Sequence, residues 1–158
     1  METLNLVHAF GFNSQLYFYD IERDDLEIID YLTVGAFATW KRQEKTLDKP
    51  GVKLAIGEIQ KDNLSESMAI IGPLLMGGVG VMNMIAPEKL ANFYRMSTTC
   101  YIPADVHGGG ERAVLEAQAC GCAIEVEDDN PKLKELVGKS WNEEYYKSQL
   151  KTGIESVL

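Results

Sequence analysis

Short apolar runs alternate with amphipathic stretches throughout residues 28–137. Five of these runs are typical of strands, at residues 29–34, 52–56, 80–85, 99–102 and 123–126. Most of them are too apolar for a strand with one face in water, so they suit strands that helices cover on both faces. The alternation predicts an α/β domain with a Rossmann-like open parallel sheet and helices on both of its faces.

The stretches between the runs carry signals for the ends of helices. Pro87 suits the first position of a helix, because proline lacks the N–H that would be unpaired there. Gly121 is placed to end a second helix, and the pair Asn130-Pro131 opens a third. Residues 141–158 predict a polar, amphipathic helix at the end of the chain.

The chain of 158 residues is expected to form a single domain. Its first part, residues 1–25, holds several aromatic side chains without a helical period, which predicts an extended segment lying on the domain. The glycines within residues 77–80 precede a strand instead of opening a helix, so they predict a turn and not a phosphate loop.

Composition and charge exclude several classes of function. A net charge of -9 argues against broad nucleic-acid binding, which needs a basic face. The sequence shows neither an apolar run of about 20 residues nor a secretory signal, so we expect no membrane span and a cytoplasmic location. Cys120 and Cys122 are too close for an ordinary disulfide or a zinc site, and with Cys100 they are expected to be reduced core residues. No metal site is predicted.

Residues 103–121 carry the most chemistry. A buried strand leads through Gly108, Gly109 and Gly110 into an amphipathic helix. The unpaired N–H groups and partial positive charge at a helix start attract anions, and glycines let an anion approach the backbone closely. Ligands also bind beyond the carboxyl ends of strands in open α/β sheets. These features predict a phosphate site, although a tight turn that needs positive φ explains the glycines about equally well.

The residues after the glycines separate these two interpretations. Residues 114–117 read Val-Leu-Glu-Ala, and residues 119–121 read Ala-Cys-Gly. This pattern resembles the donor-binding C-terminal domain of the GT-B glycosyltransferases, particularly the large retaining family 4. Residues 34–41, 85–94 and 129–136 resemble further parts of the same domain in the same order. An ordered series of matches is far more specific than any one of them.

The resemblance implies roles for individual residues. It implies that Glu116 holds the ribose hydroxyls of a nucleotide and that Lys41 is a cation on the donor diphosphate; a solvated helix acid and a surface lysine are the alternatives. A carboxylate can accept hydrogen bonds from a vicinal diol, and a flexible ammonium can follow a diphosphate as charge builds on it. The further donor-binding candidates are Gly35, His107, Gly108, Gly109, Gly110, Glu111, Ala113, Val114 and Leu115.

Two positions depart from the family pattern. Ala36 replaces an arginine, which removes one of the two usual cations on the diphosphate, and Arg112 is a candidate to replace it from the start of the helix. Gly108 stands where the family has a glutamate that contacts the donor sugar. His107 or Glu111 could take the place of that glutamate only through a shift. Sugar choice and activity depend on these two departures.

The chain is therefore expected to be one half of a GT-B fold. By the resemblance, it binds a nucleoside-diphosphate sugar without a cofactor and, with an acceptor-binding N-terminal domain missing from this chain, transfers the sugar to an acceptor hydroxyl. The resemblance also implies a retaining, hexosyltransferase-like enzyme, of which the isolated chain is inactive. A non-catalytic nucleotide-binding or interaction module, favoured by Ala36 and Gly108, is the main alternative. A sugar-nucleotide epimerase is a second, but it would need further acids and histidines.

Overall fold

The computed structural model describes residues 28–138 and 143–157, so the predicted N-terminal segment, residues 1–25, lies outside the described residues. Five strands form one sheet in the order β3-β2-β1-β4-β5, and every neighbouring pair is parallel. The strands are β1 (Ile29–Val34), β2 (Lys53–Gly57), β3 (Gly80–Asn83), β4 (Ser97–Ile102) and β5 (Ala123–Val126). The predicted open parallel sheet is confirmed.

Helices follow the strands, and four of the five α-helices lie where the sequence predicted them. They are α1 (Leu64–Met76), α2 (Pro87–Arg95), α3 (Glu111–Ala119), α4 (Pro131–Leu136) and α5 (Glu143–Val157), with short 3-10 helices η3 (Thr39–Lys41), η4 (Gln43–Asp48) and η5 (Lys61–Asn63). Pro87 opens α2 as predicted, and the Asn130 side chain caps α4 by accepting a hydrogen bond of 3.2 Å from the Leu133 N–H. Gly121, with φ at +76°, follows the end of α3.

Helix α1 was not predicted from the sequence. Pro73 lies inside it and Gly72 precedes that proline, and both residues are poor helix formers. The helix is held by tertiary packing. Its residues Ile71 and Leu74 are buried in one cluster with Ala55 of β2, with Phe37 after β1 and with Val79 after α1. Gly77 and Gly78 then form the turn into β3 that the sequence predicted.

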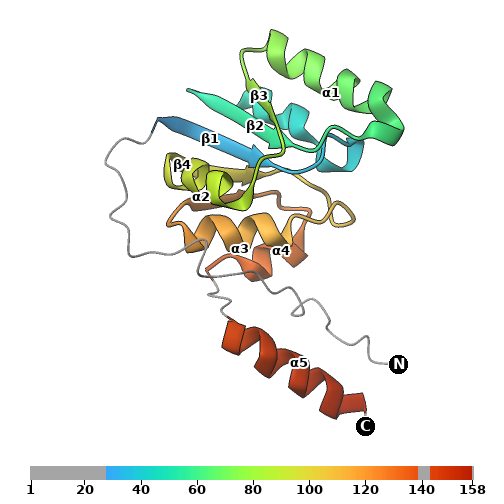
Figure 1. Ribbon diagram of the computed structural model, residues 1–158, viewed down its shortest axis with the longest axis vertical. Coiled ribbons are helices and arrows are strands. Elements are labelled where there is room, and N and C mark those ends of the chain that lie inside the picture. The colour runs from blue at the N-terminus through green and yellow to red at the C-terminus, as the bar shows by residue number, and fades with distance from the viewer. Residues whose placement is uncertain (1–27, 139–142, 158) are drawn as a thin grey trace.

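Helices cover both faces of the sheet. Helix α1 lies on one side, and α2, α3 and α4 lie on the other (Figure 1). Successive side chains of β2 alternate between the faces, so that Ala55 packs with α1 whereas Ile56 packs with α2 and α3. The larger core surrounds α3, which explains why this helix is buried along most of its length.

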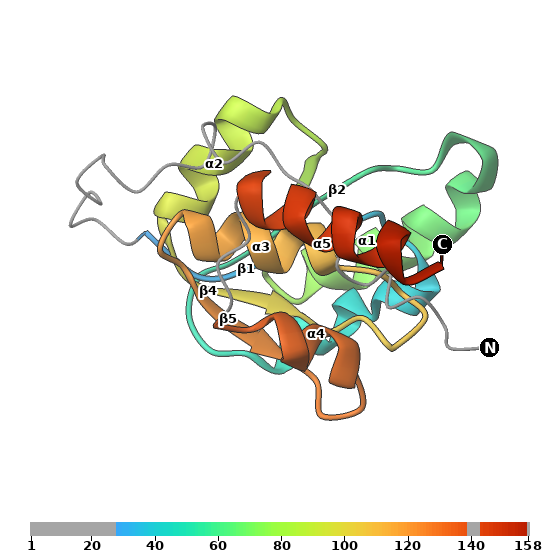
Figure 2. The ribbon, with the colours of Figure 1, turned by 90° about the horizontal axis from the view of Figure 1, so that it is seen from below.

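Helix α5 lies on the same side of the sheet as α3 and α4 (Figures 1 and 2). Its bounds fall within the predicted range 141–158. Along it, Leu150, Ile154 and Val157 are exposed, at spacings that place them on one face of the helix. The described part of the chain therefore leaves an apolar stripe of α5 uncovered.

Candidate nucleotide-binding site

A pocket of about 470 Å³ opens at the carboxyl ends of the strands. It lies where the order of the sheet reverses, because β2 follows β1 on one side and β4 lies on the other. Crevices at such positions are the usual ligand sites of open α/β sheets. The lining residues are Val34, Gly35, Lys41, Met84, Ile85, Pro87, Leu90, Gly110, Glu111, Arg112, Ala113 and Glu116.

The turn formed by Gly108, Gly109 and Gly110, here called the glycine turn, brings the start of α3 to this pocket. Gly109 and Gly110 have φ at +72° and +107°, in the region that side chains disfavour, and Gly110 is the residue that caps α3. A Cβ on Gly110 would lie 2.8 Å from Cγ2 of Ile102 and 3.2 Å from Cδ1 of Leu133. The turn therefore fits closely between the end of β4 and the start of α4, with the first N–H groups of α3 beside the pocket.

Lys41 reaches the pocket from η3. Its aliphatic stem passes Gly35, since a Cβ on Gly35 would lie 3.4 Å from Cδ and Cε of Lys41. The ammonium lies against the glycine turn, 3.4 Å from where a Cβ on Gly109 would be. Among the described residues, it has no hydrogen-bond or ion-pair partner. Burial lowers the pKa of Lys41, whereas Glu111 nearby raises it and Lys132 lowers it further.

Arg42 fixes the segment that carries Lys41. Its Nε donates a hydrogen bond of 2.7 Å to the carbonyl oxygen of Pro103, and its two terminal nitrogens donate to the Asp129 carboxylate at 2.7 and 2.8 Å. These contacts join η3 to the ends of β4 and β5. They hold Arg42 at φ +51°, a conformation that is costly for a residue with a side chain. The position of Lys41 is therefore set by its neighbour.

Glu116 lines the pocket from α3 and is held there by two side chains. Its Oε2 accepts a hydrogen bond of 3.2 Å from the hydroxyl of Tyr94, which is fully buried on α2. Its Oε1 lies 3.4 Å from Nη2 of Arg112, one turn earlier on α3. Arg112 itself is 69% exposed at the pocket rim. Both carboxylate oxygens of Glu116 are thus oriented by neighbours.

A second acid, Glu111, lies at the glycine end of the pocket. Its side chain is 10% exposed, and its Oε1 is 2.5 Å from Nζ of Lys132 on α4. Its Oε2 lies 3.5 Å from where a Cβ on Gly109 would be, on the side that the Lys41 ammonium also approaches. Glu111 therefore lies close to two lysines and pairs directly with one of them.

Gly108 has no room for a side chain. A Cβ there would lie 2.5 Å from the carbonyl oxygen of Trp40, 3.0 Å from Cβ of Ala104 and 3.2 Å from the carbonyl oxygen of Asp105. The same carbonyl oxygen of Trp40, in η3, accepts a hydrogen bond of 3.3 Å from the N–H of Asp105. Backbone thus fills the place at which the resemblance led us to expect a glutamate.

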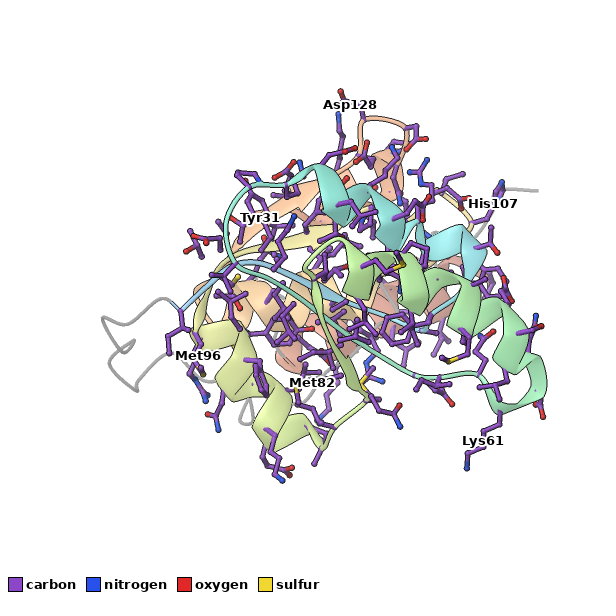
Figure 3. The ribbon with its side chains drawn as sticks, turned by 90° about the horizontal axis from the view of Figure 1, so that it is seen from above. Tyr31, Lys61, Met82, Met96, His107 and Asp128 are labelled. Carbon is purple, nitrogen blue, oxygen red and sulfur yellow. The ribbon has the colours of Figure 1, made fainter. Side chains whose placement is uncertain are left out.

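The structure brings seven of the predicted site residues together in the wall of one pocket. These are Gly35, Lys41, Gly110, Glu111, Arg112, Ala113 and Glu116. Gly109 adjoins the Lys41 ammonium without being part of that wall, and Val114 and Leu115 are buried in the core. His107 is exposed at the edge of the molecule (Figure 3) and is not among the residues that line the pocket.

Sequence reasoning missed the apolar wall of this pocket and two residues, Tyr94 and Lys132, that pair with its acids. The apolar wall of Met84, Ile85, Pro87 and Leu90 was taken only as a strand and a helix. Tyr94 lies in the helix that Pro87 was predicted to open, but its hydrogen bond to Glu116 was not predicted. Lys132 follows the last strand, and the rule that all carboxyl ends of a parallel sheet meet at one edge is the signal that points to it.

The cysteines lie in the core as predicted. Cys100, Cys120 and Cys122 are buried and free, and burial raises the pKa of the Cys120 thiol to about 12. Among the described residues, no group of three or more His, Cys, Asp and Glu side chains is arranged to hold a metal ion. No helix within residues 28–138 or 143–157 is long and apolar enough to cross a membrane.

Comparison with solved structures identifies the fold. The C-terminal domain of a glycosyl transferase group 1 family protein, LpcC, from Francisella tularensis matches with a TM-score of 0.61 at 15% identity, over 94% of this chain and 89% of that one. Sucrose-phosphate synthase from Thermosynechococcus elongatus matches with a TM-score of 0.61 at 20% identity, over 76% of this chain. HepE from Anabaena, solved with UDP and glucose, matches with a TM-score of 0.62 at 11% identity, over 93% of this chain.

This chain has a glycosyltransferase-like fold. It corresponds to one half of a GT-B architecture, as the sequence resemblance predicted. The chain spans 34% of the length of the sucrose-phosphate synthase and 45% of that of HepE. No model of a protein family matches the chain, and no curated protein does either. The likeness is thus one of tertiary structure at low sequence identity.

Proposed function

We propose that this chain is the donor-binding domain of a glycosyltransferase and that its pocket binds a nucleoside-diphosphate sugar. The observation that carries the proposal is the half-buried ammonium of Lys41. It has no partner among the described residues and lies against a glycine turn at the start of a helix. Burying a charge without a partner is costly, and a bound anion removes that cost.

The rest of the pocket supports a nucleotide as the source of that anion. Met84, Ile85, Pro87 and Leu90 form an apolar wall that suits a flat base. Glu116 lies between this wall and the glycine turn along α3, where a carboxylate can accept hydrogen bonds from ribose hydroxyls. The proposed order along the pocket is therefore base, ribose and diphosphate.

The proposed chemistry is electrostatic. When the bond between the sugar and the diphosphate breaks, negative charge grows on the departing diphosphate oxygen. Lys41 and the N–H groups at the start of α3 are placed to stabilise that charge without rearranging. The acceptor hydroxyl would be supplied by a second, acceptor-binding domain outside these 158 residues, as expected for a half of a GT-B fold. The resemblance to family 4 favours retention of configuration at the sugar.

A non-catalytic nucleotide-binding module is the second candidate. It is favoured by the filled space at Gly108, which leaves no side chain where the family contacts the donor sugar. Both candidates predict nucleotide binding by this chain, and they differ in whether the sugar is transferred once an acceptor domain is present. Release of nucleoside diphosphate from a nucleotide sugar by the two-domain assembly, against none from this chain alone, supports the enzyme.

Thermal unfolding of the 158-residue chain with UDP, GDP and ADP tests the proposal. The matching nucleosides serve as controls, because they share the base and ribose but lack the diphosphate. A ligand at about 100 times its dissociation constant stabilises the chain by roughly 2.7 kcal/mol. We expect one diphosphate to raise the melting temperature and its nucleoside to raise it less. If no diphosphate has an effect at millimolar concentration, the proposed function is wrong.

A further inference from the structure

Lys132 is not part of the pocket wall, but it brings a second positive charge to Glu111, which is part of that wall. It lies at the start of α4, next to Leu133, whose side chain packs against Gly110. Its Nζ is 2.5 Å from Oε1 of Glu111, and its side chain is 26% exposed. The Glu111 carboxylate and the Lys41 ammonium both adjoin Gly109. Lys132, Glu111 and Lys41 therefore form a continuous group of charges beside the start of α3.

Two lysines in one half-buried group repel each other. Lys132 contributes to lowering the pKa of Lys41, which shows that its positive charge acts on the Lys41 ammonium. Glu111 compensates one positive charge, so the group as a whole carries one excess positive charge. A diphosphate with two negative charges or more would satisfy both lysines, whereas a neutral ligand would satisfy neither.

We propose that Lys132 is the second cation on the donor diphosphate and that Glu111 positions it when the pocket is empty. This inference rests on the proposed function. It assigns the cation that is missing at Ala36 to Lys132 on α4 and not to Arg112, whose guanidinium lies 3.4 Å from the Glu116 carboxylate. On binding, the Lys132 ammonium exchanges its contact with Glu111 for a phosphate oxygen, and Glu111 stays close enough to accept a hydrogen bond from the sugar.

Calorimetry on the full 158-residue chain tests the proposal, with the diphosphate selected by thermal unfolding and its nucleoside as ligands. Lys132→Met removes the charge and keeps the length of the side chain, and Lys132→Arg restores the charge. Lys134→Met is the matched control, since Lys134 lies on the same helix but pairs with Asp128, which does not line the pocket, whereas Lys132 pairs with Glu111, which does. We expect Lys132→Met to weaken diphosphate binding roughly tenfold, Lys132→Arg to restore most of it, and Lys134→Met to leave it unchanged.

The variant Glu111→Gln separates direct contact from compensation of charge. If Lys132 touches the phosphates, Lys132→Met weakens diphosphate binding in the native chain and also in combination with Glu111→Gln. If Lys132 only neutralises Glu111, its loss has no effect once Glu111→Gln is present, and the proposal is overturned. Equal losses for nucleoside and diphosphate would also overturn it. A native chain that binds no diphosphate would instead reject the proposed function itself.

Discussion

Two charged groups that line the pocket, Glu116 and Lys41, differ in how firmly the protein holds them. Glu116 is held between the Tyr94 hydroxyl and the Arg112 guanidinium, so its direction is fixed before any ligand arrives. Lys41 has a fixed backbone, through the contacts of Arg42, but its ammonium has no partner among the described residues. The Glu116 carboxylate is therefore already oriented, whereas the Lys41 ammonium is available to bind an anion.

This difference suits what each group is proposed to bind, ribose hydroxyls at Glu116 and a diphosphate at Lys41. Ribose hydroxyls are neutral and directional, so an acceptor that is already aimed loses little entropy on binding them. A diphosphate is a diffuse charge that changes during the reaction, and a flexible ammonium can follow it. We propose on this basis that Glu116 sets specificity for the nucleoside and that Lys41 sets affinity for phosphate. The following variants test that division, beginning with the largest expected effect.

Lys41→Ala should cause the largest loss. We expect diphosphate binding to weaken by about 1.5–3 kcal/mol, ten- to a hundredfold, because charge-assisted hydrogen bonds to phosphate are lost. Binding of the nucleoside should change little. Lys45→Ala is the control, because Lys45 follows on η4 and pairs with Glu127 at 3.1 Å. Calorimetry with both ligands measures the effect, and equal weakening for nucleoside and diphosphate would show damage to the fold instead.

Gly108→Ala should lower the free energy of unfolding, because it disturbs the segment that carries Lys41. Its Cβ would meet the Trp40 carbonyl oxygen at 2.5 Å, so the loop before Lys41 must move, at a cost of about 1–3 kcal/mol. Gly72→Ala is the matched control, because a Cβ on that helical glycine meets nothing within 4 Å and should stabilise α1. Urea unfolding of both variants measures the difference. A stability for Gly108→Ala equal to that of the native chain would show that space is not the constraint at this position.

Glu116→Gln should affect the nucleoside part of the ligand. It removes the charge but keeps an acceptor for Tyr94, and we expect binding of a ribonucleoside diphosphate to weaken by about 1.4 kcal/mol, tenfold. A 2'-deoxy ligand should bind weakly to the native chain and lose little more with the variant. Calorimetry on the four combinations decides the question. Additive losses would mean that Glu116 does not contact the ribose.

The pH dependence should be the smallest effect. Burial lowers the pKa of Lys41, so its ammonium loses the proton at a lower pH than an ordinary lysine does. Because the charged form attracts the diphosphate, affinity should decline several-fold as pH rises through that lowered pKa. The folded chain also binds this proton less tightly than the unfolded chain does, so this group makes folding more favourable as pH rises in the same range. A decline that persists in Lys41→Ala would assign it to another group.

The order of strands and helices was predictable where local signals agreed. The apolar run 123–126 is β5, and Pro87 and Asn130 mark the starts of α2 and α4 as proline and asparagine do in general. Helix α1 was not predictable in this way, because Pro73 and Gly72 oppose a helix locally. Packing against β2 and β3 outweighs that local preference, and such packing is invisible in the pattern of the segment alone.

By itself, the sequence determined the α/β class, the glycine turn into α3 and the resemblance that singled out Lys41 and Glu116. These features follow from short-range patterns: hydrophobic period, helix ends and a motif within about 20 residues. Only the tertiary structure decided that Gly108 faces the Trp40 carbonyl and that Lys132 pairs with Glu111. Such contacts join residues from separate loops, and the packing of strands and helices, not sequence distance, sets their geometry.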